Sequence, residues 1–321
     1  MRAARIVGPG VAEVAELPDP TPAANEVIIE VAFAAVCSTD RRLVRRGELV
    51  GRIPGHEISG RLGDGTLVGV HPDTGCGRCP WCDAGQTNRC AQRRSVGIDR
   101  DGGFAERVVV PAAHVIPVDG VPAELVPLLE PLACTLHAAT RLRAEAGESA
   151  VVVGGGAMGI FAMWALQARG LRVFVRQRSP QRRRQAQELG ATGVIEASDD
   201  VSAIMDMPPD VVVVTAPGAE SLAWALTHVA EGGRVHAFAG SPDGAPVDAN
   251  IIHYRHLDLV GSTGSGLVDY RDALELVRSG AIDLARLPRT EIDLEGLPAA
   301  IAAPHFGAAL RTVVRLRRQA A

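Results

Sequence analysis

The sequence contains no lysine, so arginine supplies all 33 basic residues of the 321-residue chain. Lysine is required for Schiff-base catalysis and for phosphate binding by a P-loop, so both kinds of site are excluded. The chain also has only two tyrosines, Tyr254 and Tyr270. Without lysine, neither of them can belong to a catalytic Tyr–Lys pair.

The sequence also lacks long hydrophobic runs and a strong net charge. No apolar run reaches the roughly eighteen residues of a membrane span, and the N-terminal MRAARIVGPG has no apolar secretory segment. The formal net charge is -4, which gives no reason to expect binding to nucleic acid or to an acidic membrane. We therefore expect a cytoplasmic protein without nucleic-acid or membrane partners.

Four of the six cysteines lie in one short stretch, TGCGRCPWCDAGQTNRC, at residues 74–90. Their spacing, C-x2-C-x2-C-x7-C, is typical of a tetrahedral zinc site built from thiolates. Two disulfides are the alternative, which a reducing cytosol disfavours. Nearby glycines let the backbone turn tightly enough to aim several sulfurs at one point. We predict a structural zinc held by Cys76, Cys79, Cys82 and Cys90.

This stretch resembles the structural-zinc lobe of the zinc-dependent medium-chain dehydrogenases, a family of alcohol and polyol dehydrogenases. Other motifs of that family recur in order along nearly the whole chain, and CSTD, residues 37–40, resembles the one that carries the first ligand of a catalytic zinc. The resemblance implies that Cys37 is this ligand, that Thr39 hydrogen-bonds the substrate oxygen and that Asp40 supports the site from behind. Taken alone, CSTD could also be a buried cysteine before a helix N-cap.

Two further motifs supply the other expected ligands of this zinc. PGHEISG, residues 54–60, resembles the second ligand motif, which implies that His56 binds the metal and that Glu57 binds it or lies just behind it. In LLEPLACTLHAATRL, residues 128–142, family members with a Glu-Pro use the glutamate at the zinc site, which implies the same for Glu130. Cys134 is the alternative, but we favour Glu130 because a residue four positions later projects from a different helical turn.

The segment after CSTD departs from the family pattern. Family members often have a histidine two residues after the aspartate, where it relays the alcohol proton to solvent, whereas this sequence has Arg42. A guanidinium cannot accept a proton at neutral pH. We therefore predict that Arg42 engages a polar or anionic substrate. The other arginines of RRLVRRGELVGR, residues 41–52, could simply be solvated.

A glycine-rich turn marks the predicted dinucleotide site. AVVVGGGAMGIFAMWALQARG, residues 150–170, has the pattern of an apolar strand, a tight turn and a helix. Its glycines fit G-x-G-x-x-G in that context, so we predict that pyrophosphate binds at the helix N-terminus. Thr215 ends a second buried strand and should line the same edge of the sheet. The predicted contacts are Gly154, Gly156, Ala157, Met158, Gly159 and Thr215.

The next strand and turn, LRVFVRQRSPQRRR at residues 171–184, bear on the choice of cofactor. Gln177 occupies the position where the family usually has the acidic residue that binds the ribose 2′-hydroxyl. Arg176, Arg178 and Arg182 surround it, and a 2′-phosphate favours arginine without a nearby carboxylate. A solvated, arginine-rich helix start is the alternative. We predict that NADP(H) is preferred over NAD(H).

Apolar and polar residues alternate over residues 1–36 and 103–118, which predicts antiparallel strands. After residue 150, strand and helix patterns alternate, which predicts a parallel sheet. We predict an α/β fold with a Rossmann-type doubly wound sheet and a mainly antiparallel, GroES-like catalytic domain. The dinucleotide domain should cover residues 139–267, and the catalytic domain residues 1–138 and 268–321, with the zinc lobe at 74–91.

The resemblance implies a zinc-dependent oxidoreductase that interconverts a secondary alcohol, polyol or cyclitol hydroxyl and its carbonyl with a nicotinamide cofactor. It also implies two zinc ions per chain and a homodimer or homotetramer. Two alternatives remain, a zinc-independent NADPH alkene or quinone reductase of the same superfamily and a non-catalytic dinucleotide-binding protein. The reductases usually lack the cysteine and GHE ligands, so two zinc ions per chain would favour the dehydrogenase.

Overall fold

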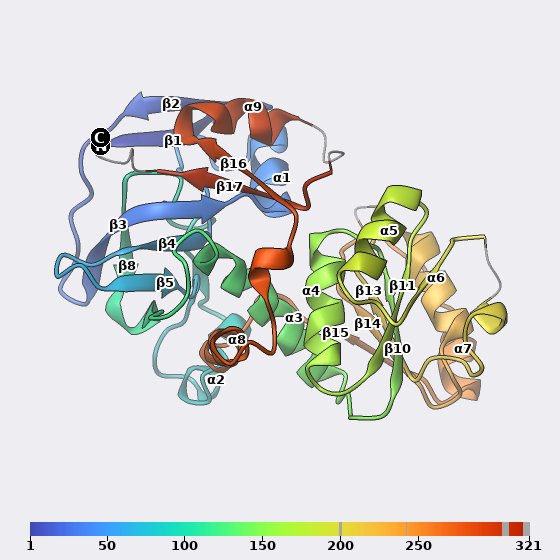
Figure 1. Ribbon diagram of the computed structural model, residues 1–321. Coiled ribbons are helices and arrows are strands. Elements are labelled where there is room, and N and C mark those ends of the chain that lie inside the picture. Colours follow the sequence, from blue (N-terminus) through green and yellow to red (C-terminus); the bar gives the residue numbers. More distant parts are fainter. Residues whose placement is uncertain (199–200, 242, 304–307, 317–321) are drawn as a thin grey trace. The chain divides into compact units, whose positions relative to one another are not determined.

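The computed structural model describes residues 1–198, 201–241, 243–303 and 308–316. It contains two compact units (Figure 1), one made of Met1–Glu130 and Ser265–Ala321 and the other of Pro131–Gly264. The predicted boundaries, after residues 138 and 267, fall a short distance beyond these. Helix α3 (Leu129–Arg141) runs through the first boundary, so no turn signal marks the change of unit.

An antiparallel sheet dominates the first unit. Its strands follow the order β16-β17-β3-β4-β5-β9, and β8 pairs with β3. All pairings are antiparallel except that of β16 with β17. A separate hairpin joins β1 (Arg2–Gly8) to β2 (Val11–Glu16). The seven strands of the sheet are β3 (Glu26–Ala35), β4 (Glu57–Arg61), β5 (Leu67–Val70), β8 (Arg107–Pro111), β9 (Val115–Pro117), β16 (Arg289–Asp293) and β17 (Arg311–Arg315).

The alternating pattern of these strands buries one set of side chains. Ile6, Ile29, Ile58 and Phe104 are fully or almost fully buried in one apolar cluster. This confirms the antiparallel strands predicted from period-two alternation, because such a strand turns every second side chain to the core. The helices of the unit are α1 (Ser38–Arg46), α2 (Pro80–Asp83), α8 (Leu267–Arg278) and α9 (Leu297–Ala302).

The second unit is a parallel sheet with helical crossovers. The six parallel strands follow the order β12-β11-β10-β13-β14-β15. The order of connection switches between β10 and β13, and doubly wound sheets bind ligands at the carboxyl ends of the strands beside such a switch point. Right-handed crossovers place α4 and α5 on one face, and α6 and α7 on the other (Figure 1). The strands are β10 (Ser149–Val153), β11 (Arg172–Arg176), β12 (Gly193–Ile195), β13 (Val211–Val214), β14 (Arg234–Ala237) and β15 (Asp258–Gly261). The helices are α4 (Ala157–Gln167), α5 (Pro180–Glu188), α6 (Ala219–His228) and α7 (Ala249–Tyr254).

The central strands β10 and β13 are buried along their whole length, as the runs of valine in their sequences predict. Within the described ranges, no helix combines the length and apolar character that crossing a bilayer requires.

Burial keeps histidines in both units in their neutral form. In the first unit, the Nε2 of His71 lies 2.9 Å from the carbonyl oxygen of Ser265, so this nitrogen donates. Its Nδ1 is then the acceptor for the Nδ1–H of His114, 3.3 Å away. Burial lowers the pKa of His114 to about 4. In the second unit, burial likewise lowers the pKa of His236 to about 4.

The low pKa values of these histidines predict that the protein loses stability in acid. Unfolded histidine binds a proton near pH 6.5, whereas folded His236 does so only near pH 4. The unfolding free energy should therefore decrease as the pH is lowered from about 6.5 to about 4. The decrease should be up to about 1.4 kcal/mol per pH unit for each such group. Urea unfolding at several pH values gives the unfolding free energy as a function of pH. This free energy should depend less steeply on pH in His236→Leu than in the parent. Identical slopes would contradict this assignment.

Candidate functional site

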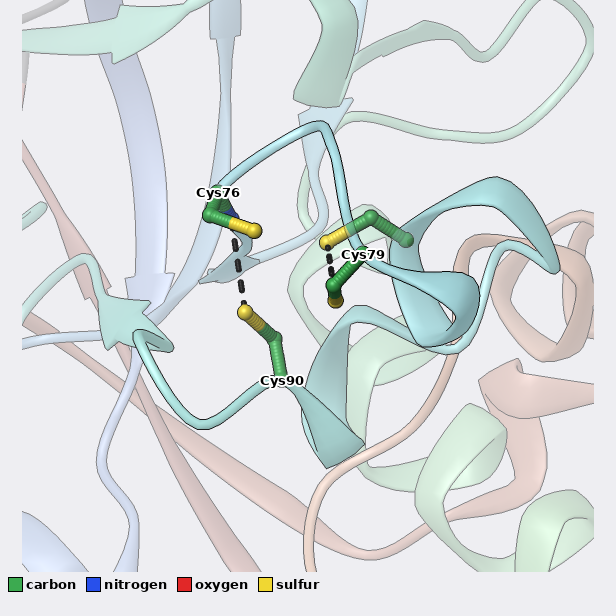
Figure 2. Close-up of side chains that lie close together, drawn as sticks. Cys76, Cys79 and Cys90 are labelled. Atoms are coloured by element: carbon green, nitrogen blue, oxygen red, sulfur yellow. Dashed lines mark hydrogen bonds between the residues drawn. The ribbon is translucent and has the colours of Figure 1, made fainter.

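The four predicted zinc-binding cysteines converge in the first unit. Their sulfurs all lie within 4.8 Å of one another, and those of Cys79 and Cys82 are 3.6 Å apart. Figure 2 shows the Cys76, Cys79 and Cys90 side chains directed toward one another. Sulfurs around a tetrahedral zinc are about 3.8 Å apart, given bonds of about 2.3 Å. The cysteines are free thiols, so this geometry fits a metal and gives no support to the disulfide alternative.

The local backbone explains the convergence. A β-carbon on Gly75 would lie 2.3 Å from the sulfur of Cys82, so only glycine leaves room for that ligand. The backbone N–H groups of Cys76 and Gln92 donate to the sulfur of Cys90 at 3.4 and 3.3 Å. The Cys76 N–H contributes most to lowering the pKa of Cys90 to about 7, which favours the thiolate that zinc requires.

The cysteine lobe also holds the start of α8, where the chain re-enters the first unit. The N–H of Leu267 donates to the carbonyl oxygen of Gly85 at 3.1 Å. A β-carbon on Gly266 would lie 2.7 Å from the same oxygen, so this close approach requires glycine. The lobe therefore fixes backbone far from it in sequence.

Cys37, His56 and Glu57 form a second group that could hold a metal ion, with candidate ligand atoms also within 4.8 Å of one another. Cys37 is the N-cap of α1, and Glu57 is the first residue of β4. The predicted supporting residue, Asp40, is fully buried. Its carboxylate accepts hydrogen bonds from the N–H groups of Cys37 at 2.8 Å and Gly55 at 3.1 Å, and lies 3.4 Å from the Nδ1 of His56. One aspartate thus positions two of the three ligands.

The electrostatics of this group set the protonation state of each candidate ligand. Although burial opposes it, Asp40 and Cys37 raise the pKa of His56, and burial raises that of Glu57, so a bound cation would displace protons from both. Burial alone would raise the pKa of the Cys37 thiol, but His56 and then Arg311 outweigh burial and lower it to about 6. A thiolate at neutral pH is the form that binds zinc. The Oε2 of Glu57 is buried and has no hydrogen-bond partner among the described residues. Such an oxygen is available to a cation, and the donor set of sulfur, nitrogen and oxygen suits zinc.

Arg311, at the start of β17, is a residue of this site that the sequence analysis missed. Its Nη2 forms a buried ion pair with the Oε1 of Glu57 at 3.1 Å, and its Nη1 donates to the carbonyl oxygen of Val36 at 3.1 Å. No motif surrounds Arg311, and only the pairing of distant strands brings it to Glu57. We regard it as a positioning residue.

The remaining predicted residues fall outside this group of three. Glu130 is buried in the first turn of α3. It contributes to raising the pKa values of Glu57 and Arg311, but it is not one of the three residues whose ligand atoms converge. Thr39 lies two residues after Cys37 in the first turn of α1. Arg42 pairs with Glu48 at 3.0 Å. Cys134, the alternative to Glu130, is part-buried in α3.

The second unit contains the predicted glycine turn between β10 and α4. A β-carbon on Gly159 would lie 1.8 Å from the carbonyl oxygen of Gly154, so glycine is required for the helix to start so close to the strand. The space around Gly156, the N-cap of α4, is open to at least 4 Å. The Thr215 hydroxyl donates to the carbonyl oxygens of Val153 and Gly154 at 3.0 and 3.2 Å, which fixes the turn. Ala157 and Met158 are the first two residues of α4. The N-terminus of a helix favours anions, so this turn fits a pyrophosphate.

The predicted 2′-phosphate residues separate into two groups. Side-chain carbons of Gln177 and Arg182 border Gly155, at 3.3 and 3.5 Å from a β-carbon built on it. Arg178 is exposed beside them. Arg176, in contrast, places its guanidinium 4.4 Å from the ring centre of Trp224 in α6.

Arg183, which the sequence analysis did not single out, braces this turn. It donates to the carbonyl oxygens of Gln177 and Arg178 at 2.9 and 2.7 Å and pairs with Glu196 at 3.0 Å. The run of three arginines at 182–184 does not reveal which of them turns back onto the strand end.

Known proteins match both units. Residues 23–120 match the family model for the alcohol dehydrogenase GroES-like domain, and residues 157–279 match that for the zinc-binding dehydrogenase. A 2-dehydro-3-deoxy-L-galactonate 5-dehydrogenase of Pseudoalteromonas atlantica is 32% identical over 82% of this chain and 83% of its own. An L-threonine 3-dehydrogenase of Pyrococcus furiosus is 30% identical over 85% and 86%.

Among solved structures, a putative zinc-binding dehydrogenase from Sinorhizobium meliloti bound to NADP has a TM-score of 0.90 and 29% identity, covering 98% of this chain and 99% of its own. These matches extend over both units and over the motifs described above. The chain belongs to the zinc-dependent medium-chain dehydrogenases and is an alcohol dehydrogenase that uses zinc and a nicotinamide cofactor.

Proposed function

We propose that the enzyme oxidises a secondary hydroxyl group of a polar substrate, such as a polyol, a cyclitol or a sugar acid, and catalyses the reverse reduction. The observation that carries this proposal is the buried Cys37–His56–Glu57 group, held by Asp40 and Arg311. Zinc bound there would act as a Lewis acid on the substrate oxygen, and the nicotinamide would accept or supply the hydride. Thr39 hydrogen-bonds the substrate oxygen, and Glu130 contributes a further carboxylate to the metal site.

The polar-substrate proposal rests on Arg42 and on the relatives. Both relatives described above have names that denote carboxylate-bearing substrates. Arg42 lies in α1, the helix that Cys37 caps, and Glu48 offsets part of its charge. Such a half-paired guanidinium can still donate to a carboxylate or a hydroxyl, because it has five N–H donors.

The first test concerns metal content. We expect two zinc ions per chain by elemental analysis. Cys79→Ser should lose one zinc and much of the stability, because structural zinc contributes directly to folding. His56→Ala should lose the other zinc and the activity while remaining folded. Cys134→Ser is the matched control and should keep both ions, whereas normal turnover by folded His56→Ala would disprove the assignment.

The second test concerns Arg311. Arg311→Met should lower the free energy of unfolding by about 3–5 kcal/mol, because it leaves the Glu57 carboxylate buried without its partner. The double variant Glu57→Gln/Arg311→Met should recover most of that loss, since the buried charge is gone. Urea unfolding of the three proteins measures this. If Arg311→Met is as stable as the parent, Arg311 does not balance Glu57.

The third test concerns cofactor choice, which we assign to NADP(H) over NAD(H). Gln177 stands where a carboxylate would repel a 2′-phosphate, so Gln177→Asp should shift the ratio of kcat/KM values toward NAD(H). Gln187→Asp, which adds the same charge to an exposed site later in α5, is the control. A native preference for NAD(H) of tenfold or more, about 1.4 kcal/mol, would overturn this assignment.

The fourth test compares substrates. Arg42→Ala should raise KM for anionic or polyhydroxylated substrates by tenfold or more and should change KM for simple aliphatic alcohols little. Glu48→Gln, which frees Arg42 from its partner, should have the opposite effect on anionic substrates. Equal effects of Arg42→Ala on charged and neutral substrates would show that this arginine does not anchor the substrate.

A further inference from the structure

The cysteine lobe, residues 74–91, has almost no apolar core of its own. None of residues 75–86 is buried, and α2, which lies within this segment, buries no side chain. Trp81 of α2 is exposed, and its ring is covered only by the guanidinium of Arg89, 3.4 Å away. Burial of apolar surface therefore contributes little to holding this segment. The four sulfurs and the metal that they bind must hold it instead.

A hollow in the surface gives small reagents access to these sulfurs. It has a volume of about 250 Å³ and is lined by Arg78, Gln92 and three of the cysteines, Cys76, Cys79 and Cys90. Cys82 does not line the hollow, but its sulfur lies 3.6 Å from that of Cys79. Cys79 is thus within reach of a reagent, and Cys82 stands beside it as a second thiol.

The turn after Cys82 connects the lobe to α8. The N–H of Gly85 donates to the carbonyl oxygen of Cys82 at 3.0 Å, and the carbonyl oxygen of Gly85 accepts from the N–H of Leu267 at 3.1 Å. Further along α8, the fully buried Tyr270 packs so closely on Gly69 that no β-carbon would fit there. A displacement of Cys82 would therefore reach the first turn of α8, while the rest of the helix stays fixed to β5.

We propose that Cys79 and Cys82 form an oxidation site, at which a hydroperoxide converts the two thiolates to a disulfide and the lobe releases its metal. The Cys79 thiolate attacks the peroxide, displaces hydroxide and becomes a sulfenic acid. The Cys82 thiolate then attacks that sulfur and displaces a second hydroxide, which forms the disulfide. The thiolates lose two electrons, the peroxide gains them, and two protons from solvent convert the hydroxides to water.

The consequence of this oxidation follows from the weak packing of the lobe. Cys76 and Cys90 remain as thiolates, but they are only two of the four ligands that a structural zinc site uses. Without the metal, residues 75–86 lose what holds them, and the bond from Leu267 to Gly85 is lost with them. The effect falls just after Ser265, where the chain returns to the first unit. The inference concerns this lobe alone and does not depend on the substrate or the nicotinamide cofactor.

Peroxide treatment of the full-length Cys37→Ser variant isolates this site. The substitution removes the thiol of the other candidate metal group, so the zinc that remains should be that of the lobe. Hydrogen peroxide should release one zinc ion per chain, measured with a chromogenic chelator, in step with a Cys79–Cys82 disulfide mapped by mass spectrometry. Reduction by a dithiol with added zinc should reverse both. Cys37→Ser/Cys134→Ser is the matched control and should respond identically, because Cys134 lies outside both groups.

Hydrogen exchange measures the effect on α8. After oxidation, amides in the first turn of α8 should exchange at least about tenfold faster, while those of β3 in the same unit should stay protected. Zinc release without the Cys79–Cys82 disulfide, or the disulfide without zinc release, would overturn the inference. Unchanged exchange at the start of α8 in the oxidised protein would overturn it too. A Cys37→Ser protein that holds no zinc before oxidation would refute both the inference and the structural zinc.

Discussion

The buried ion pair between Glu57 and Arg311 is the constraint on which the first unit depends. Burial raises the pKa of the Glu57 carboxyl, and the Arg311 guanidinium opposes this shift, so the ionised carboxylate depends on the pair. Strand register brings this pair together. Glu57 pairs with Ala35 across β4 and β3, and Ala35 pairs with Val313 across β3 and β17. Arg311 therefore enters the site two strands away from Glu57, and a shift of register in either strand would leave both charges unpaired.

This register also explains why the chain must return to its first unit after building the second. The sequence up to Glu130 supplies Cys37, His56 and Glu57 but contains no cation that pairs with Glu57 among the described residues. The last described strand, β17, brings Arg311. The candidate metal site is thus completed by a strand far along the chain, and α8 is anchored on the way by the cysteine lobe through Gly85. A truncation after the second unit would remove a site residue as well as an edge of the sheet.

Local spacing predicted the parts of the structure that local geometry determines. The four cysteines and the glycine turn each lie in one short stretch, and Asp40 bonds Cys37 within one helical turn, so local spacing carries this information. The bond of Asp40 to Gly55 is not local in this sense. Arg311 could not be found in this way, because its partner is chosen by strand pairing. Arg176 was identified as a cofactor residue by its charge, but its direction depends on the face of β11 to which it belongs. A family pattern gives the residue type at a position and not the helix that its side chain meets.

Arginine supplies the basic side chains of this fold, and several of their contacts use the planar guanidinium group. Arg176 stacks on Trp224 and Arg89 stacks on Trp81 at 3.4 Å, a contact that uses the flat guanidinium face. Arg41 donates to the carbonyl oxygens of Ala300 and Ala303, both at 2.6 Å, which satisfies the end of α9. Arg311 binds Glu57 and a backbone carbonyl at once. A lysine ammonium is a strongly hydrated point charge that could not stack in this way, so several contacts here depend on arginine and not merely on positive charge.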